Sequence, residues 1–158
     1  MSTTHDELAG VVDLFGALTH VELTAALDEL AFKQGQDVDE AALRSAIEAA
    51  IEAYALVEYE PADSTKPLVA VGPTAFRSLP PNAEDLPHIL DFDRRSVDRD
   101  RLAAQVRQRL TVEAERVVDA DDTARAAELL DVSYDIEAWA SVDTGGVRSA
   151  LEPVLPQD

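Results

Sequence analysis

The sequence predicts a mostly α-helical protein with a small β-hairpin, arranged as a winged-helix-like N-terminal domain and a helical C-terminal segment. Apolar residues recur at helical intervals over residues 4–54, which predicts three short helices. Two β-prone runs, LVEYE and LVAVG, follow directly. Helical spacing returns beyond a proline-rich stretch. Three helices followed by a hairpin is the element order of a winged-helix domain.

The first two helices begin at capping boxes, in which a threonine is followed three residues later by a glutamate. The two boxes are Thr4 with Glu7 and Thr19 with Glu22. The first helix extends to about Leu18, and the second has His20 as its first residue and Gly35 as its C-cap.

The third helix is expected to start at Asp37, with Glu40 three residues on. Its buried side is the apolar set Leu43, Ile47, Ala50, Ile51 and Tyr54. The hairpin follows, and its two runs are joined by the polar loop PADSTKP at 61–67. The winged-helix-like domain then ends near Arg77, giving predicted bounds of 1–77.

Residues 78–96 contain the run SLPPNAEDLP and are predicted to form a stiff, proline-rich connector. The C-terminal segment is 97–158. Its first part is a long amphipathic helix over about 97–119, followed by a shorter helix that Asp121 or Asp122 caps and that runs through Leu130.

Three later features of this segment are less regular. Residues 132–140 fit both strand and helical spacing, and we favour a helix because a lone strand would have no partner. The run TGG at 144–146 is expected to be a flexible break. Pro153 and Pro156 indicate a frayed end.

Net charge is the strongest compositional signal, because 32 acidic residues stand against 13 basic ones for a net of −19. Only Lys33 and Lys66 are lysines. Such an acidic surface repels itself in dilute buffer and is suited to a cytoplasm at molar salt, where screening acts within about 3 Å. We therefore expect a halophilic, cytoplasmic protein. No signal peptide or 18-residue apolar span is present, so no membrane partner is expected.

Four stretches of the chain carry a resemblance to a known family: DELAGVVDLFGALT, LAFKQGQDVDEAAL, EDLPHILD and LLDVSYDIEAWA. Together they resemble a family of short, acidic, uncharacterised proteins of halophilic archaea. The resemblance covers nearly the whole chain and supports the halophilic milieu. It implies no activity, ligand or catalytic residue. Residues 4–72 are also similar to winged-helix domains, in element order and not in a sequence motif.

The third helix would be the recognition helix of a winged-helix DNA-binding protein. Its outward face is predicted to carry Glu40, Arg44, Glu48 and Glu52, and the wing adds Lys66. Base edges are read by Arg, Lys, Asn or Gln close to phosphates. The three carboxylates on this face disfavour DNA binding. If DNA binding is the alternative function, Arg44 and Lys66 are the candidate nucleic-acid contacts.

The other candidate interaction residues lie in the C-terminal half, and they are Arg94, Arg95, Arg99, Arg107, Tyr134 and Trp139. The arginines could bind phosphate or RNA, or could belong to a solvated lattice of ion pairs. Arg99 and Arg107 lack carboxylates at helical spacing. Trp139 and Tyr134 could anchor the core, form an interface hot spot, or lie on a helix that docks in a groove.

No catalytic set is found in the sequence. The chain has no cysteine, and its three histidines, His5, His20 and His88, are dispersed without metal-ligand spacing. His88 with Asp91 and Asp93 is the one acid-base corner to consider, as the basis of a rival enzymatic function. We expect no enzyme, cofactor or metal. The leading hypothesis is a protein that acts through protein contacts or self-association, and the alternative is a DNA-binding regulator.

Overall fold

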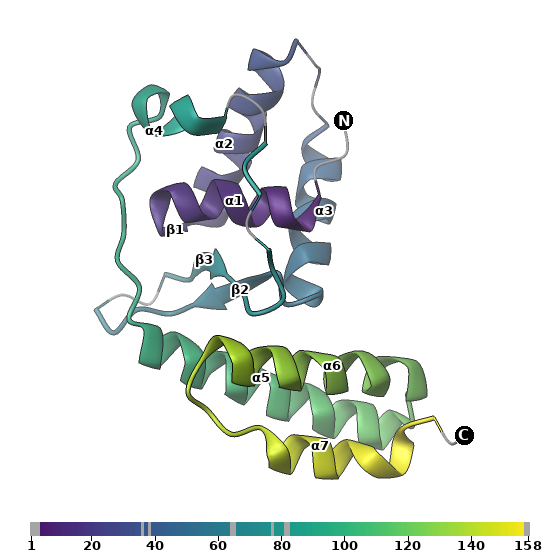
Figure 1. Cartoon of the computed structure of the whole chain (residues 1–158). Coiled ribbons are helices and arrows are strands. Elements are labelled where there is room, and N and C mark those ends of the chain that lie inside the picture. Colours follow the sequence, from purple (N-terminus) through teal and green to yellow (C-terminus); the bar gives the residue numbers. More distant parts are fainter. Residues whose placement is uncertain are drawn as a thin grey trace. The chain divides into compact units, whose positions relative to one another are not determined.

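The computed structural model describes residues 4–35, 37, 39–63, 66–76, 78–80 and 83–156. The chain divides into two compact units, Met1–Val97 and Asp98–Asp158. The predicted fold class is confirmed, because helices predominate and the strands form a small antiparallel sheet (Figure 1).

The first unit has the order α-β-α-α-β-β, followed by two short helical turns. Its elements are α1 (His5–Phe15), β1 (Ala17–Leu18), α2 (His20–Lys33), α3 (Glu40–Glu52), β2 (Leu56–Tyr59), β3 (Leu68–Val71), η1 (Ala83–Asp85) and α4 (Leu86–Ile89). The strands lie in the order β1-β3-β2, and both pairs are antiparallel. Ala17 pairs with Ala70, and Val57 pairs with the same Ala70 on its other side.

Both predicted capping boxes are confirmed. Glu7 and Glu22 each donate a backbone N–H to a threonine hydroxyl at 3.1 Å, and each accepts the threonine's backbone N–H in return. Gly35 follows the end of α2 at a positive φ of 69°, a conformation that glycine adopts without steric cost.

Three predicted helix bounds are wrong. Leu18 lies in strand β1 and not in the first helix, because Gly16 has φ 82° and ends α1 at Phe15. The third helix begins at Glu40, since Asp39 and not Asp37 accepts the capping hydrogen bond. Tyr54 is fully buried as predicted, but it lies beyond α3 in a turn with φ 63°.

Residues 78–96 are predicted as a connector, yet their described part belongs to the first unit and contributes to its core. Leu86 is fully buried in the core of that unit, and the ring of Phe92 lies 5.8 Å from that of Phe15. The backbone N–H of Ser78 donates to Asp6 at 3.1 Å. Arg77, where the predicted domain ends, lies outside the described residues, as do Ser64 and Thr65 of the hairpin loop.

The second unit is a small bundle of α5 (Arg99–Ala120), α6 (Thr123–Trp139) and α7 (Gly145–Leu151), followed by η2 (Glu152–Val154). Each of these helices packs against the other two (Figure 1). Asp122 caps α6, which runs unbroken to Trp139, so the helical interpretation of 132–140 is confirmed and the predicted end at Leu130 is too early.

The run at 144–146 is not a flexible break. Thr144 is buried, its hydroxyl donates to Ser133 O at 2.9 Å, and Gly145 begins α7. Pro153 lies in η2 beside the buried Val154, so the frayed end predicted from that proline is also wrong. Satisfied hydrogen bonds make this corner part of the bundle.

Candidate functional site

The outward face of α3 is as predicted. Its charged residues Glu40, Arg44, Glu48 and Glu52 are all exposed, while Ile47 and Ala50 of the same helix are buried. Lys66 is exposed in the loop before β3. A nucleic acid that approached this helix would meet three carboxylates and one guanidinium.

Arg95 is a structural residue of the first unit. Its guanidinium donates to both carboxylate oxygens of Glu22, at 2.6 and 3.2 Å, and to Ala17 O at 3.1 Å. Burial alone would raise the pKa of the Glu22 carboxyl. Hydrogen bonds from Arg95 and from the Thr19 backbone outweigh that effect, so the pKa lies below its ordinary value. Arg94 beside it is exposed and makes no hydrogen bond or ion pair within the described residues.

The other predicted interaction residues have partners inside the second unit. The guanidinium of Arg99 lies 5.0 Å from the centre of the Trp139 ring, and that of Arg148 lies 4.4 Å from the Tyr134 ring. Arg107 Nε donates to Asp143 O at 3.0 Å. Arg99 and Arg107 thus lack carboxylates but use a ring face and a carbonyl oxygen instead.

The rival corner of His88, Asp91 and Asp93 is open to solvent, since all three residues are exposed and none lines the groove described below. Among the described residues, no group of three or more histidine and carboxylate side chains is placed to hold a metal ion.

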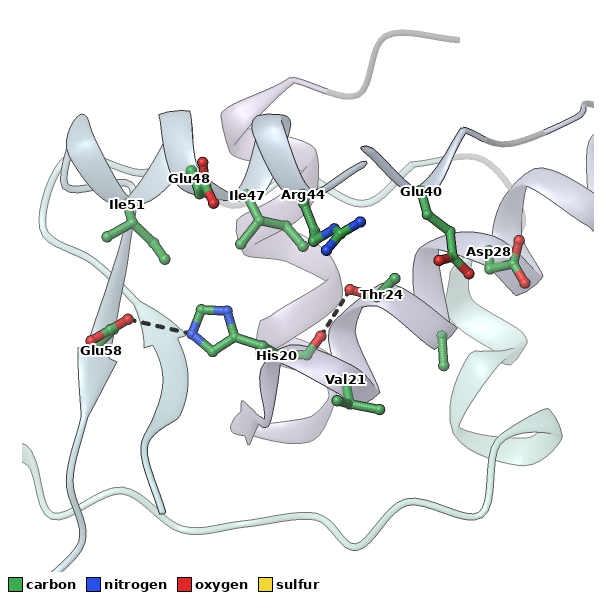
Figure 2. Close-up of a pocket in the computed structure, with 11 residues that line it drawn as sticks. His20, Val21, Thr24, Asp28, Glu40, Arg44, Ile47, Glu48, Ile51 and Glu58 are labelled. Atoms are coloured by element: carbon green, nitrogen blue, oxygen red, sulfur yellow. Dashed lines mark hydrogen bonds and ion pairs between the residues drawn. The ribbon is translucent and has the colours of Figure 1, made fainter. Parts of the chain in front are cut away.

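A groove of about 690 Å³ lies between α2 and α3. It is lined by His20, Val21, Thr24, Ala25, Asp28, Glu40, Arg44, Ile47, Glu48, Ile51 and Glu58. Figure 2 shows His20 and Glu58 at one end and Asp28 with Glu40 toward the other. Its apolar lining comes from both helices.

Most of the charges in the groove have no internal partner. The side chains of Asp28, Glu40, Arg44 and Glu48 make no hydrogen bond or ion pair in the part of the chain that the structure describes. The exception is Glu58, whose carboxylate lies 3.4 Å from His20 Nε2 across the groove end (Figure 2). Four carboxylates against one guanidinium give the groove a negative potential that favours cationic ligands.

The sequence indicated only one wall of this groove. Helical periodicity predicts the exposed α3 charges, but nothing in the sequence places α2 or Glu58 beside them. Val21 of the α2 wall is 80% exposed, so it is an apolar residue without a core role.

Fold and groove together define a mostly helical protein of two compact units, one of which presents an open acidic groove. The chain belongs to the family described as Family of unknown function (DUF7109), whose sequence profile matches residues 6–156. No curated protein and no solved structure matches the chain. Within the described residues, no helix combines the length and the apolar character needed to cross a membrane.

Proposed function

We propose that this protein is non-enzymatic and binds a protein partner in the groove between α2 and α3, with the winged-helix-like first unit as the scaffold. The observation that carries the proposal is a groove with an apolar lining whose charged residues Asp28, Glu40, Arg44 and Glu48 have no partner in the described chain. Isolated charges around apolar surface are typical of a binding site and contribute nothing to the fold by pairing.

The chemistry of the groove favours binding over catalysis. Thr24, the one hydroxyl residue among those that line it, donates to His20 O at 2.9 Å and so has no general base as its acceptor. His20 itself faces Glu58 at the groove end.

A variant that fills the groove tests the proposal. Ala25 is exposed on α2 and lines the groove, whereas Glu29 on the same helix does not. In a pull-down from a native lysate at molar KCl, the wild type and Glu29→Gln should retain the same partner, and Ala25→Arg should lose it. Failure of the wild type to retain any protein, with a monomer by light scattering, contradicts the proposal, as does equal retention by Ala25→Arg.

A DNA-binding regulator is the second candidate, and the observation that favours it is the topology. The α-β-α-α-β-β order, with β1 added to the β2-β3 hairpin, is the arrangement expected of a winged helix. Arg44 and Lys66 would be the phosphate contacts. Chromatin immunoprecipitation at native salt should then enrich particular genomic sites, and enrichment should fall for Arg44→Ala with Lys66→Ala; uniform coverage argues against DNA binding.

The proposed setting is the cytoplasm of a halophile. The support is compositional, because 32 acidic residues and only 13 basic ones give a surface that needs salt to screen it. At molar salt, counterion release contributes little to nucleic-acid affinity, so a protein partner has a relative advantage there.

A further inference from the structure

We infer that the occupant of the groove is a helical segment of a protein partner with a basic residue at position i, an acidic one at i+4 and a basic one at i+8, beside a row of aliphatic side chains. This inference rests on the proposed function and specifies the partner's chemistry. It follows from how charged and apolar rows are placed on the two groove walls.

The charged row lies on α3. Glu40, Arg44 and Glu48 are spaced by four residues, so they lie on one face of the helix at steps of about 6 Å. The row reads negative, positive, negative, and none of the three is paired within the described chain. A complementary surface must read positive, negative, positive at the same pitch, because like charges in register repel.

The ends of the groove strengthen the preference for bases at the two outer positions. Asp28 of α2 lies toward the end marked by Glu40, and Glu58 of β2 lies at the other end (Figure 2). Each outer position of the charged row therefore has a further carboxylate on another element. Arg44 is the only arginine or lysine among the lining residues. We therefore expect an acidic residue of the partner at the middle position of the row.

An apolar row runs beside the charged one. Ile47 and Ile51 are also four residues apart on α3, and Val21 and Ala25 are four apart on α2. From Glu40 to Ile51 the groove extends about 16 Å, the length of three helical turns. Its aliphatic lining matches the apolar stripe of an amphipathic helix that docks in a groove.

The occupant is a helix and not an extended peptide because both rows must be met from one side. On a helix, adjacent rows at i and i+3 or i+4 face the same way. On a strand, successive side chains point to opposite faces, so a charged row and an apolar row of the same repeat point apart. Only the helical arrangement satisfies the charged and apolar rows of α3 together.

Synthetic peptides of about three to four turns test this inference in NMR titrations of the labelled full chain at 0.5 M and 2 M KCl. The first peptide carries Lys, Glu and Lys four residues apart beside a leucine row. The second has the charges inverted to Glu, Lys and Glu, and a third places Lys, Glu and Lys two residues apart for an extended chain. We expect the first to shift α2 and α3 amides and to bind about three- to tenfold tighter than the second at 0.5 M KCl, since exposed ion pairs contribute modestly.

A charge-reversed variant decides whether the charged row of Glu40, Arg44 and Glu48 determines which peptide binds more tightly. Glu40→Lys with Arg44→Glu and Glu48→Lys should bind the inverted peptide more tightly, while Glu29→Lys, on α2 but outside the groove lining, should keep the wild-type preference; circular dichroism checks that each variant is folded. Equal affinities, tighter binding of the extended peptide or of a DNA oligonucleotide, or no reversal overturns the inference. Loss of the lysate partner from the wild type in the pull-down would instead overturn the proposed function.

Discussion

The two compact units use their charged residues in different ways. In the groove of the first unit, Asp28, Glu40, Arg44 and Glu48 are unpaired within the described chain. In the second unit, Glu113 lies between two arginines and accepts hydrogen bonds at 2.9 Å from Arg109 and at 2.9 Å from Arg125. Charged side chains stabilise the helix bundle, as the Glu22–Arg95 pair does in the first unit, whereas those of the groove are unpaired in the described chain.

The two arginines that share Glu113 are partly buried, with side chains 26% exposed for Arg109 and 16% exposed for Arg125. Burial alone would lower the pKa of Arg125, but hydrogen bonds to Glu128 and Glu113 raise that pKa above its usual value. The comparison shows that acidic residues can have two different effects in one chain. Carboxylates that pair with arginines link neighbouring helices, whereas unpaired carboxylates give a surface a local negative potential. Five experiments can break or sharpen this comparison.

Salt should have the largest effect, and it should be larger in the first unit. Residues 1–97 carry 18 acidic and 6 basic residues, and residues 98–158 carry 14 and 7. At 0.01 M salt the Debye length is about 30 Å, so carboxylates repel across a whole unit and the chain should unfold. Thermal melts should show a midpoint that climbs steeply with KCl and that, at low salt, is higher at pH 5 than at pH 8.

Amide signals followed by NMR during KCl withdrawal should disappear first from residues 4–97. A melt that is flat between 0.05 M and 2 M KCl would contradict both the halophilic setting and the unequal charge effect.

Gly16→Ala should be the most damaging single substitution in the first unit. Gly16 has φ 82°, and an added Cβ would lie 1.9 Å from the carbonyl oxygen of Arg95. Positive φ and steric overlap each cost about 1–3 kcal/mol, so we expect the free energy of unfolding to fall by about 3 kcal/mol or more in urea titrations at molar KCl.

The matched control lies in the second unit, where an added Cβ at Gly146 meets nothing within 4 Å. Gly146→Ala should be neutral or slightly stabilising, because alanine is the better helix former. Similar losses for the two variants would show that the contact between Gly16 and Arg95 is unimportant.

Glu113→Ala should destabilise the second unit by about 2 kcal/mol. The change removes the carboxylate that the partly buried arginines 109 and 125 share, although Arg125 keeps its hydrogen bond to Glu128 at 2.7 Å. Loss of a partly buried charge partner is costly. Glu115 is exposed on the same helix, so Glu115→Ala should change the free energy of unfolding by less than about 0.5 kcal/mol. Equal urea midpoints for the two variants would remove the contrast between paired and unpaired charges.

Glu22→Gln should cost about 1 kcal/mol at pH 7, because it removes the charge that Arg95 binds. The folded pKa of Glu22 lies below its ordinary value of 4.5, so its contribution is full above that value and is lost as the pH falls through the folded pKa. The difference between wild type and variant should therefore shrink in urea titrations below pH 4.5. A difference that persists unchanged in acid would contradict the ion-pair explanation.

Asp135→Asn should have the smallest effect on the free energy of unfolding, and it should be stabilising where the preceding substitutions are destabilising. Burial, and then the negative charge of Asp131, raise the pKa of Asp135 above its ordinary value of 3.8. Ionisation of Asp135 therefore lowers the stability of the folded chain as the pH rises above 3.8. Removing this like-charge pair should stabilise the chain by about 0.3 kcal/mol at pH 7 and not at all well below pH 3.8. Destabilisation at neutral pH would be the contrary result.

Local signals predicted the helices well, whereas long-range contacts stayed hidden. Thr4 and Glu7 are three residues apart, so their capping box can be read directly from the sequence. Strand β1 has two residues, too few for any periodicity, and it exists because Ala17 and Leu18 pair with β3 some fifty residues on. The ion pair of Glu22 with Arg95 joins residues that are 73 apart in the chain.

The candidate site likewise has one part that local sequence signals predict and one part that depends on long-range contacts. Helical spacing was sufficient to place Glu40, Arg44 and Glu48 on one exposed face. The opposite wall depends on how α2 packs beside α3, and the groove end depends on Glu58 of β2 meeting His20. Neither relation has a sequence signature, because each arises from tertiary packing and not from local repetition.

Arg95 also sets an order of events during synthesis. Its backbone N–H donates to Phe15 O at 2.8 Å, and its guanidinium holds Ala17 and Glu22 near the opposite end of the unit's sequence. Chains emerge from the ribosome N-terminus first, so α1, the sheet and α3 are complete in sequence before the residue that fastens them has been made. Until then Phe15 lacks Phe92 and the core lacks Leu86. The nascent first unit therefore exposes an apolar edge, and it becomes a closed unit only when residue 95 has followed.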